Sequence, residues 1–261
     1  MRRWGAIMGG DPFSSVFTTM PCDENGRIAF LDAHLKRIKR HAEQLDVDVP
    51  GDFDERVFIK ISELQGLTEQ SAIPSHLATL RLTRDGEISI NLRPNKQNVS
   101  PMKAISVPDP LWPENIKGTK HGDWEPYKKA RKKAIDAGAH IALFVEDEAV
   151  TDADRATPIL LDVDGTVWIA DSLNGGVDSI TASIITNSLE DNGIPINRGR
   201  LHQKLIGRAM EFIVVGSGIG VARIDDIDGQ KIGSMKDGIL TKTATEVLHI
   251  ALKDSWMGEE E

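Results

Sequence analysis

The spacing of hydrophobic and polar positions in the first hundred residues predicts a small α+β unit. Runs of β-branched and aromatic residues that alternate with polar ones fit strands. Leu35, Ile38 and Ala42 recur at helical spacing, and Asp32 precedes them as the expected N-cap. The predicted elements are strands at 13–20 and 28–30 joined by a hairpin at Asn25-Gly26, a helix at 32–45, a helix at 53–64, and strands at 77–83 and 88–92.

The second half of the chain alternates between strand and helix patterns. It predicts helices at 125–137 and 180–191 and strands at 141–145, 159–161, 167–169, 212–215 and 221–224. Between the two halves, residues 94–119 contain several prolines and predict a linker without regular structure. We therefore expect an α+β fold of two domains, a small one at 1–105 and a larger one at 106–261.

Composition narrows the class of protein. The chain has 261 residues, of which 40% are hydrophobic and 27% charged, a globular balance. Its net charge of −9 argues against nucleic acid as a partner, and the basic run at 128–133 fits a solvated helix face. Cys22 is the single cysteine, and neither a signal peptide nor a membrane-spanning run is evident. These features predict a cytoplasmic protein.

Taken alone, the residues offer three weak candidates for chemistry. The helix expected to begin at 179–181 can present backbone N–H groups to a phosphate, and the glycine-rich loop at 216–220 is a looser phosphate candidate. A Ser-capped helix that binds nothing and a simple tight turn are the alternatives. Lys120 stands between the linker and a helix, but nothing in the residues alone separates it from Lys117. The histidines show no metal-ligand spacing.

Five short stretches nevertheless occur in a recognisable order. They are His34-Leu35-Lys36-Arg37-Ile38, Lys120 followed by a helix and Gly138, the acidic segment 150–157, Ser179-Ile180-Thr181-Ala182, and Gly216-Ser217-Gly218-Ile219. Together they resemble the motifs of the class IV aminotransferases, the fold-type IV enzymes that use pyridoxal 5′-phosphate (PLP). This group includes D-amino-acid and branched-chain aminotransferases and aminodeoxychorismate lyase. The resemblance implies a small α+β domain followed by a larger, α/β barrel-like domain.

The resemblance also implies roles for individual residues. Lys120 corresponds to the lysine that carries PLP as an internal aldimine, and its spacing from Gly138 selects it over Lys117. Asp152 takes the place of the family's glutamate at the pyridine nitrogen, with Asp154 as the competing candidate. Thr157 stands where the family has asparagine.

The phosphate of PLP is assigned to three places by the same resemblance. Arg37 corresponds to the family's phosphate-binding arginine. Ile180 and Thr181 open the helix that donates backbone N–H groups, and Ser217 and Gly218 form a second phosphate loop.

Substrate contacts are implied at two further positions. Phe13 stands where some relatives have tyrosine, and Arg84 stands where some bind the substrate carboxylate. A hairpin arginine that faces water is the alternative for Arg84.

The expected activity is amino-group transfer between an amino acid and a 2-oxo acid, in a homodimer. The alternatives are a PLP lyase of the aminodeoxychorismate type and a catalytically weak binding protein on the same scaffold.

Overall fold

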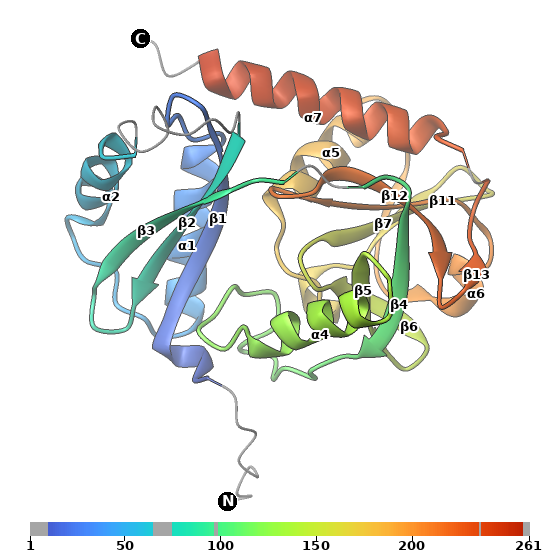
Figure 1. Cartoon of the computed structure of the whole chain (residues 1–261), viewed down its shortest axis with the longest axis horizontal. Helices are drawn as coiled ribbons and strands as arrows, with labels where there is room; N and C mark the ends of the chain where they lie inside the picture. Colours follow the sequence, from blue (N-terminus) through green and yellow to red (C-terminus); the bar gives the residue numbers. More distant parts are fainter. Residues whose placement is uncertain (1–9, 65–74, 97–98, 235, 258–261) are drawn as a thin grey trace, which may run out of the picture.

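The computed structural model describes residues 10–64, 75–96, 99–234 and 236–257. Two sheets form the molecule, and Figure 1 shows the smaller one on the left and the larger one on the right. Long helices cover the outer faces of both sheets. The α+β class and the two-part architecture agree with the sequence prediction.

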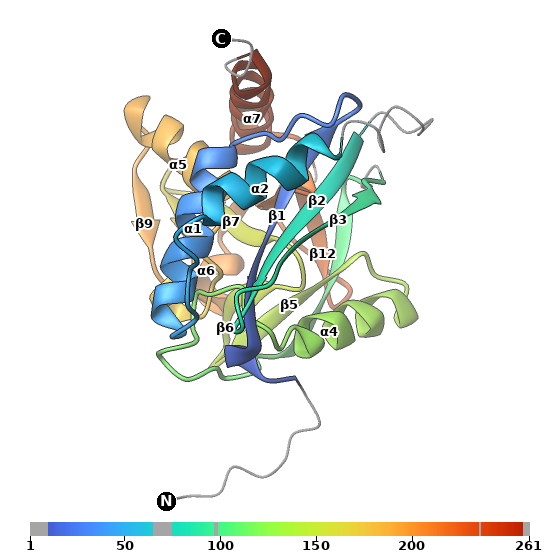
Figure 2. The same ribbon diagram turned by 90° about the vertical axis from the view of Figure 1, so that its left-hand side faces the viewer.

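The smaller sheet contains β1 (Ser15–Asp23), β2 (Ser75–Thr83) and β3 (Ile88–Pro94) in antiparallel order β1-β2-β3. The helices α1 (Leu31–Gln44) and α2 (Phe53–Ser62) pack along one face of it, as Figure 2 shows. Successive side chains of a strand point to opposite faces. Val16 and Leu80 therefore enter the core under the helices, whereas Phe17 and Arg81 point away from it, toward the larger sheet.

The larger sheet is strongly curled and runs in the order β10-β6-β5-β4-β12-β11-β7-β8-β9, with β13 added at β12. Its strands are β4 (Met102–Pro108), β5 (Ile141–Glu146), β6 (Ala149–Ala153), β7 (Thr157–Asp162), β8 (Val167–Ile169), β9 (Ile196–Arg198), β10 (Leu201–His202), β11 (Ala209–Gly216), β12 (Gly220–Ile227) and β13 (Gln230–Lys231). Its helices are α4 (Glu125–Asp136), α5 (Ile180–Asp191), α6 (Gln203–Ile206) and α7 (Ile239–Met257). Short 3-10 helices lie at Pro12–Ser14 and Ser172–Asn174.

The two faces of the larger sheet belong to different cores. Phe212 and Val214 of β11 fill the inside of the curl, while Ile213 and Val215 pack outward against α5 and α7. A separate cluster fixes α4 against β4 and β5.

The linker prediction for residues 94–119 is wrong over part of its length. Residues 102–108 form β4, a central strand that pairs in parallel with both β5 and β12. Its prolines do not interrupt the ladder because Pro101 precedes the strand and Pro108 ends it. The smaller sheet ends at Pro94 and the larger one begins at Met102.

Two local predictions also need correction, and one helix was missed. Asp32 does not cap α1: the helix begins at Leu31, and its N-cap is Phe30 in a left-handed conformation. The expected strand at 28–30 reduces to one bridge between Cys22 and Ile28, because β1 pairs with β2 instead. The long helix α7 was not predicted, although Leu240, Ala244 and Leu248 are spaced for it.

Candidate active site

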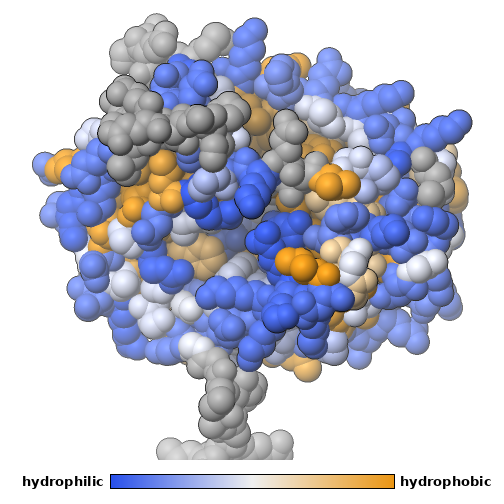
Figure 3. Space-filling view, viewed as in Figure 1, coloured by the Kyte–Doolittle hydropathy of each residue, from blue (hydrophilic) through white to orange (hydrophobic). Residues whose placement is uncertain are grey.

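A cavity of about 850 Å³ lies between the two sheets. Figure 3 shows the molecule hollowed between its two halves, with hydrophilic residues around the opening. The exposed face of the smaller sheet forms one side, and α4, the start of α5 and the loops of the larger sheet form the rest. A cavity of this size is typical of a small-molecule site.

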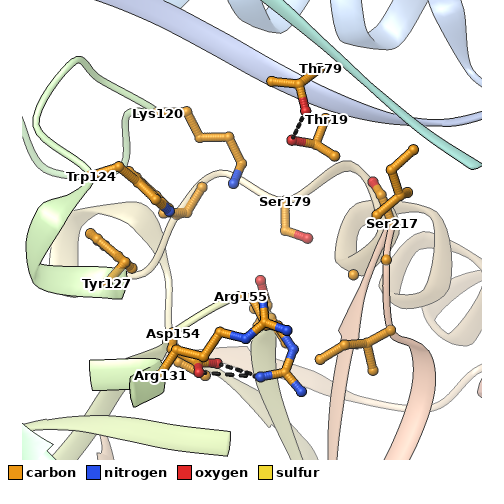
Figure 4. A pocket seen from close by; sticks show the side chains of 18 of the residues that line it. Thr19, Thr79, Lys120, Trp124, Tyr127, Arg131, Asp154, Arg155, Ser179 and Ser217 are labelled. Atoms are coloured by element: carbon orange, nitrogen blue, oxygen red, sulfur yellow. Dashed lines mark hydrogen bonds and ion pairs between the residues drawn. The ribbon is translucent and has the colours of Figure 1, made fainter. Parts of the chain in front are cut away.

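Lys120 extends into the cavity from a segment that is attached to β1 (Figure 4). The carbonyl of Lys120 accepts from the N–H of Phe17 at 3.0 Å, and the N–H of Gly122 donates to Pro12. A Cβ at Gly122 would collide with Ser14 and the Asp11 carbonyl, so only glycine permits this approach. Tight backbone attachment therefore fixes the direction of the lysine side chain. Lys117 does not line the cavity and pairs with Glu114 at 2.9 Å.

The surroundings of Lys120 favour its neutral amine. Burial, followed by the cation of Arg37, lowers the pKa of Lys120 to about 7, although Asp152 opposes the shift. Its Nζ lies 4.7 Å from the ring centroid of Trp124 and 5.3 Å from that of Phe17. A lysine with this pKa can act as a nucleophile or as a base near neutral pH.

Arg37 reaches the cavity from α1 and is held by two acceptors. One guanidinium nitrogen donates to the carbonyl of Asp178 at 2.9 Å and another to the hydroxyl of Thr18. Thr18 in turn contacts Nδ1 of His34 at 2.7 Å. The hydroxyl of Thr18 therefore links Arg37 to His34. The Nε of Arg37 has no partner among the described residues.

Two carboxylates at the C-terminal end of β6 face the cavity. Asp152 in β6 and Asp154 just after it both line the cavity, as expected for positions two apart in an extended chain. Burial raises the pKa of Asp152 to about 8, while a backbone hydrogen bond from Ala153 and the cation of Lys120 lower it. Asp154 is paired with Arg155 at 3.2 Å. Of the two, Asp152 is the acid that shares its environment with Lys120.

The two predicted phosphate segments lie in the same cavity. α5 begins at Ile180 behind its N-cap Ser179, and both residues line the cavity. The first N–H groups of a helix have no intrahelical acceptor, so those of Ile180 and Thr181 remain available. Ser217 and Gly218 line the cavity from the turn between β11 and β12.

Close approach explains the glycine in this turn. A Cβ at Gly218 would lie 2.8 Å from Cδ1 of Leu77 in β2. The turn therefore touches the smaller sheet at the edge of the cavity. Thr157, at the start of β7, is also buried and lines the cavity.

The structure does not bring the two expected substrate residues to this cavity. Phe13 packs against the core of the smaller sheet, and Arg84 is exposed in the turn between β2 and β3. Phe17 and Arg81 line the cavity instead, because they occupy the face of β1 and β2 opposite the helices. The guanidinium carbon of Arg81 lies 5.0 Å from the Phe17 ring centroid.

Several cavity residues on α4 escaped the sequence prediction. Trp124 and Tyr127 stack at 3.7 Å between ring centroids beside Lys120, and Lys128 and Arg131 follow on the same side of α4. The basic run of α4 is indeed exposed, but these two cations also border the cavity. The missed signal is helical spacing: Lys128 lies four positions after Trp124, and Arg131 lies four positions after Tyr127.

Comparison with known families agrees with this arrangement. A model of the amino-transferase class IV family matches residues 15–227. The chain therefore belongs to the class IV aminotransferases, a family of PLP-dependent enzymes. No curated protein matches the chain in a sequence search.

Solved structures show the same fold. A protein described as a 4-amino-4-deoxychorismate lyase from Legionella pneumophila has a TM-score of 0.80 at 18% identity, covering 96% of each chain. A hypothetical aminotransferase from Mycobacterium tuberculosis, in its PLP-bound form, has a TM-score of 0.78 at 17% identity, covering 93% of this chain and 90% of its own. The branched-chain aminotransferase from Thermoproteus uzoniensis with norvaline has a TM-score of 0.78 at 18% identity, covering 95% and 87%.

The residues of the cavity suit PLP. Phosphate needs fixed cationic and N–H donors, which Arg37 and the start of α5 provide. An aldehyde needs a neutral primary amine, which Lys120 offers near pH 7. A buried carboxylate whose pKa is raised needs a cationic partner, and a protonated pyridine nitrogen would be one for Asp152.

The structure contains no helix long and apolar enough to cross a membrane in the part of the chain that it describes.

Proposed function

We propose that this chain transfers an amino group between an amino acid and a 2-oxo acid, with PLP attached to Lys120. The observation that carries the proposal is the presence of Lys120 and Asp152 in one cavity, each with its pKa moved toward neutrality. Such matched pKa shifts are common at catalytic sites. Bound PLP supplies an aldehyde that condenses with a primary amine and a ring that accepts the electron pair left at the amino acid's Cα.

Lys120 has two tasks in this proposal. Its neutral Nζ attaches the cofactor, and after the substrate amine has replaced it, the free Nζ moves the proton of the substrate's Cα. Burial beside Trp124 and Phe17 limits hydration of this amine, so little solvent must reorganise around Nζ.

Asp152 and Arg37 would contact different groups of bound PLP. Asp152, as a carboxylate, would keep a proton on the pyridine nitrogen and so increase the electron demand of the ring. Arg37, the N–H groups of Ile180 and Thr181, and the turn at Ser217 and Gly218 would hold the phosphate. Thr157 lines the cavity at the start of β7 and has no assigned task.

A PLP lyase is the second candidate. The Legionella protein, whose structural alignment covers 96% of each chain, is described as a 4-amino-4-deoxychorismate lyase. The two activities differ in what they leave on the enzyme. A transferase given an amino donor without an oxo acid converts its PLP stoichiometrically into pyridoxamine phosphate. A lyase releases product without this conversion.

The experiment is therefore a single turnover of PLP-loaded protein with a panel of D- and L-amino acids, followed by chromatography of the released cofactor. Pyridoxamine phosphate with any donor supports amino transfer. Product release from aminodeoxychorismate without pyridoxamine phosphate supports the lyase. No change of cofactor absorbance with any amine would leave only a binding protein.

Assembly, domain division and location complete the proposal. We infer a cytoplasmic homodimer, supported by the family's assembly near a two-fold interface and by the single cysteine. Its mass by light scattering at micromolar concentration tests the dimer, and a monomer would contradict it.

We also infer two domains whose boundary lies near residues 95–101, slightly before the position predicted from the sequence. This division is supported by the end of β3 at Pro94 and the start of β4 at Met102.

A further inference from the structure

The backbone of Lys120 is held on both sides of its Cα. Its carbonyl accepts from the N–H of Phe17 in β1 at 3.0 Å. Its N–H donates to Nδ1 of His41 in α1 at 3.1 Å. The first contact joins two backbones, whereas the second depends on one side chain of α1. The imidazole of His41 is therefore a contact of the Lys120 backbone that a single substitution can remove.

Two neighbours of His41 on α1 hold adjoining parts of the site. Arg37 lies four positions before His41 and reaches the cavity, and Gln44 lies three positions after it. The side-chain amide of Gln44 donates to the carbonyl of Lys117 at 3.1 Å. One face of α1 thus carries Arg37 and also holds the segment that leads to Lys120. The helix thereby relates the position of the Lys120 backbone to that of the guanidinium.

The hydrogen bond to Lys120 defines the protonation state of His41. A backbone N–H can only donate, so Nδ1 must be free of a proton in order to accept. The proton of the neutral imidazole is then on Nε2, which lies 3.9 Å from the carboxylate of Asp178, too far for a hydrogen bond. His41 is only 1% exposed, so water has little access to compete for Nδ1.

The surroundings of His41 keep its imidazole neutral. Burial lowers the pKa of His41 to about 3, and nearby basic groups add to the shift. These groups are, in decreasing order of effect, Arg37, Arg40, Lys120 and His121. The carboxylate of Asp178, which faces Nε2 from the segment before α5, is itself paired with Arg40. The imidazole therefore remains an acceptor throughout the pH range around 7 in which the amine of Lys120 changes its charge.

The position of the Lys120 backbone decides where the amine lies. Nζ stands beside two aromatic rings, 4.7 Å from the centroid of Trp124 and 5.3 Å from that of Phe17. The stem of a lysine is flexible, so a backbone that shifts would let Nζ leave these rings and become hydrated. Hydration favours the charged ammonium form. Loss of the backbone contact should therefore raise the pKa of Lys120.

We propose that His41 is a positioning residue for the amine of Lys120: its neutral imidazole holds the Lys120 backbone so that Nζ stays beside Trp124 and Phe17. This inference rests on the proposed function, because that function gives the amine its task. The acceptor is needed because a buried backbone N–H without a partner is unfavourable. A side chain without an acceptor at this position would leave the N–H of Lys120 unpaired.

The test measures the pKa of Lys120 in the cofactor-free protein. Trace acetylation over a range of pH, followed by peptide mass spectrometry, reports the fraction of neutral amine at this lysine. His41→Leu removes the acceptor. His41→Asn keeps one, because its amide oxygen stands at the same number of bonds from the backbone as Nδ1. Val57→Ala in α2, a buried position that does not line the cavity, controls for a loss of stability that leaves His41 in place.

We expect the pKa of Lys120 to rise by about one unit or more in His41→Leu, a common size for pKa changes inside proteins. It should stay near 7 in His41→Asn and in Val57→Ala. The direction of the shift is informative, because a leucine beside an unmoved Lys120 would make the surroundings more apolar and would not raise the pKa. His41→Gln, whose amide lies one bond farther from the backbone, replaces His41→Leu if that variant does not fold, and the same rise is expected.

Two results would overturn the positioning role. One is an unchanged or lowered pKa of Lys120 in the variant without the acceptor. The other is an equal rise in His41→Asn or in Val57→Ala, which would show that the acceptor at this position has no specific effect.

Borohydride labelling of PLP-saturated wild-type protein separates this inference from the proposed function. PLP found on Lys120, together with an unchanged pKa in His41→Leu, defeats the positioning role and leaves amino transfer intact. The expected rise in pKa without PLP on wild-type Lys120 defeats the proposed function and leaves the positioning role of His41 intact.

Discussion

Replacing Asp152 with asparagine should separate stability from catalysis. The substitution keeps the shape of the side chain and removes its charge. In the folded protein without cofactor, burial raises the pKa of Asp152 from 3.8 to about 8. Each pKa unit corresponds to about 1.4 kcal/mol, so the full difference is on the order of 6 kcal/mol as an upper limit. The attraction of Lys120 is already contained in this pKa of about 8.

The sign depends on pH. An acid whose pKa is raised by folding costs stability as pH rises from its unfolded value toward its folded value. At pH 5 the folded protein holds Asp152 protonated, whereas the unfolded chain has already lost this proton, so Asp152→Asn should gain only about 1.6 kcal/mol there, from 1.2 pKa units above the unfolded value of 3.8. At pH 9 Asp152 is charged and Lys120 is neutral, so the cofactor-free variant should be the more stable protein. Bound PLP should reverse this order, because it gives the carboxylate a cationic partner.

Catalysis should change in the opposite direction. Asp152→Asn should still bind PLP but lose on the order of 10²–10³-fold in the rate of amino transfer, as when one preorganised electrostatic group is removed. Asp152→Glu should remain active. The assays are thermal unfolding with and without PLP at pH 5 and 9, and single-turnover kinetics. A fully active Asp152→Asn protein, or one with no stability gain at pH 9, would refute the assignment of Asp152.

Three further predictions follow from the geometry. The rate at which cofactor-free protein captures PLP should rise with pH around a midpoint near 7, because burial lowers the pKa of Lys120; a midpoint near that of free lysine would contradict this. Arg37→Ala should weaken PLP binding by about 1.5–3 kcal/mol. Thr18→Val, which removes one acceptor of Arg37, should weaken it by about 1 kcal/mol. Equilibrium dialysis measures both affinities, and unchanged values would argue against the phosphate site. Gly122→Ala should destabilise the fold by about 1–3 kcal/mol in urea unfolding. Gly51→Ala, whose added methyl group meets open space, should not. Equal effects of the two variants would contradict the close approach of Gly122 to the residues that precede β1.

Much of the fold followed from local pattern. The helix at 180–191 was predicted to the residue, since Ser179 caps its start and Asn192-Gly193 ends it. β4 was missed because its flanking prolines outweighed its alternation, and only pairing with β5 and β12 makes it a strand. α7 was also missed. Its N-terminus is fixed by Glu211, whose carboxylate accepts from the N–H groups of Leu240 and Thr241. Contacts of that range are invisible in a linear pattern.

The candidate site was predictable where a motif binds through the backbone or through one fixed side chain. Lys120, Arg37 and Asp152 all line the cavity. The substrate side was not predictable, because it depends on which face of a strand is left uncovered. Phe17 and Arg81 face the cavity only because α1 and α2 cover the other face of the smaller sheet.

The central claim is that Lys120 carries PLP. Purified protein saturated with PLP can be reduced with borohydride, digested, and mapped by mass spectrometry. The account predicts one pyridoxyl group per chain, on Lys120, and none on Lys120→Ala protein treated in the same way. A label on Lys117, which pairs with Glu114 outside the cavity, or no label on saturated protein, would contradict it.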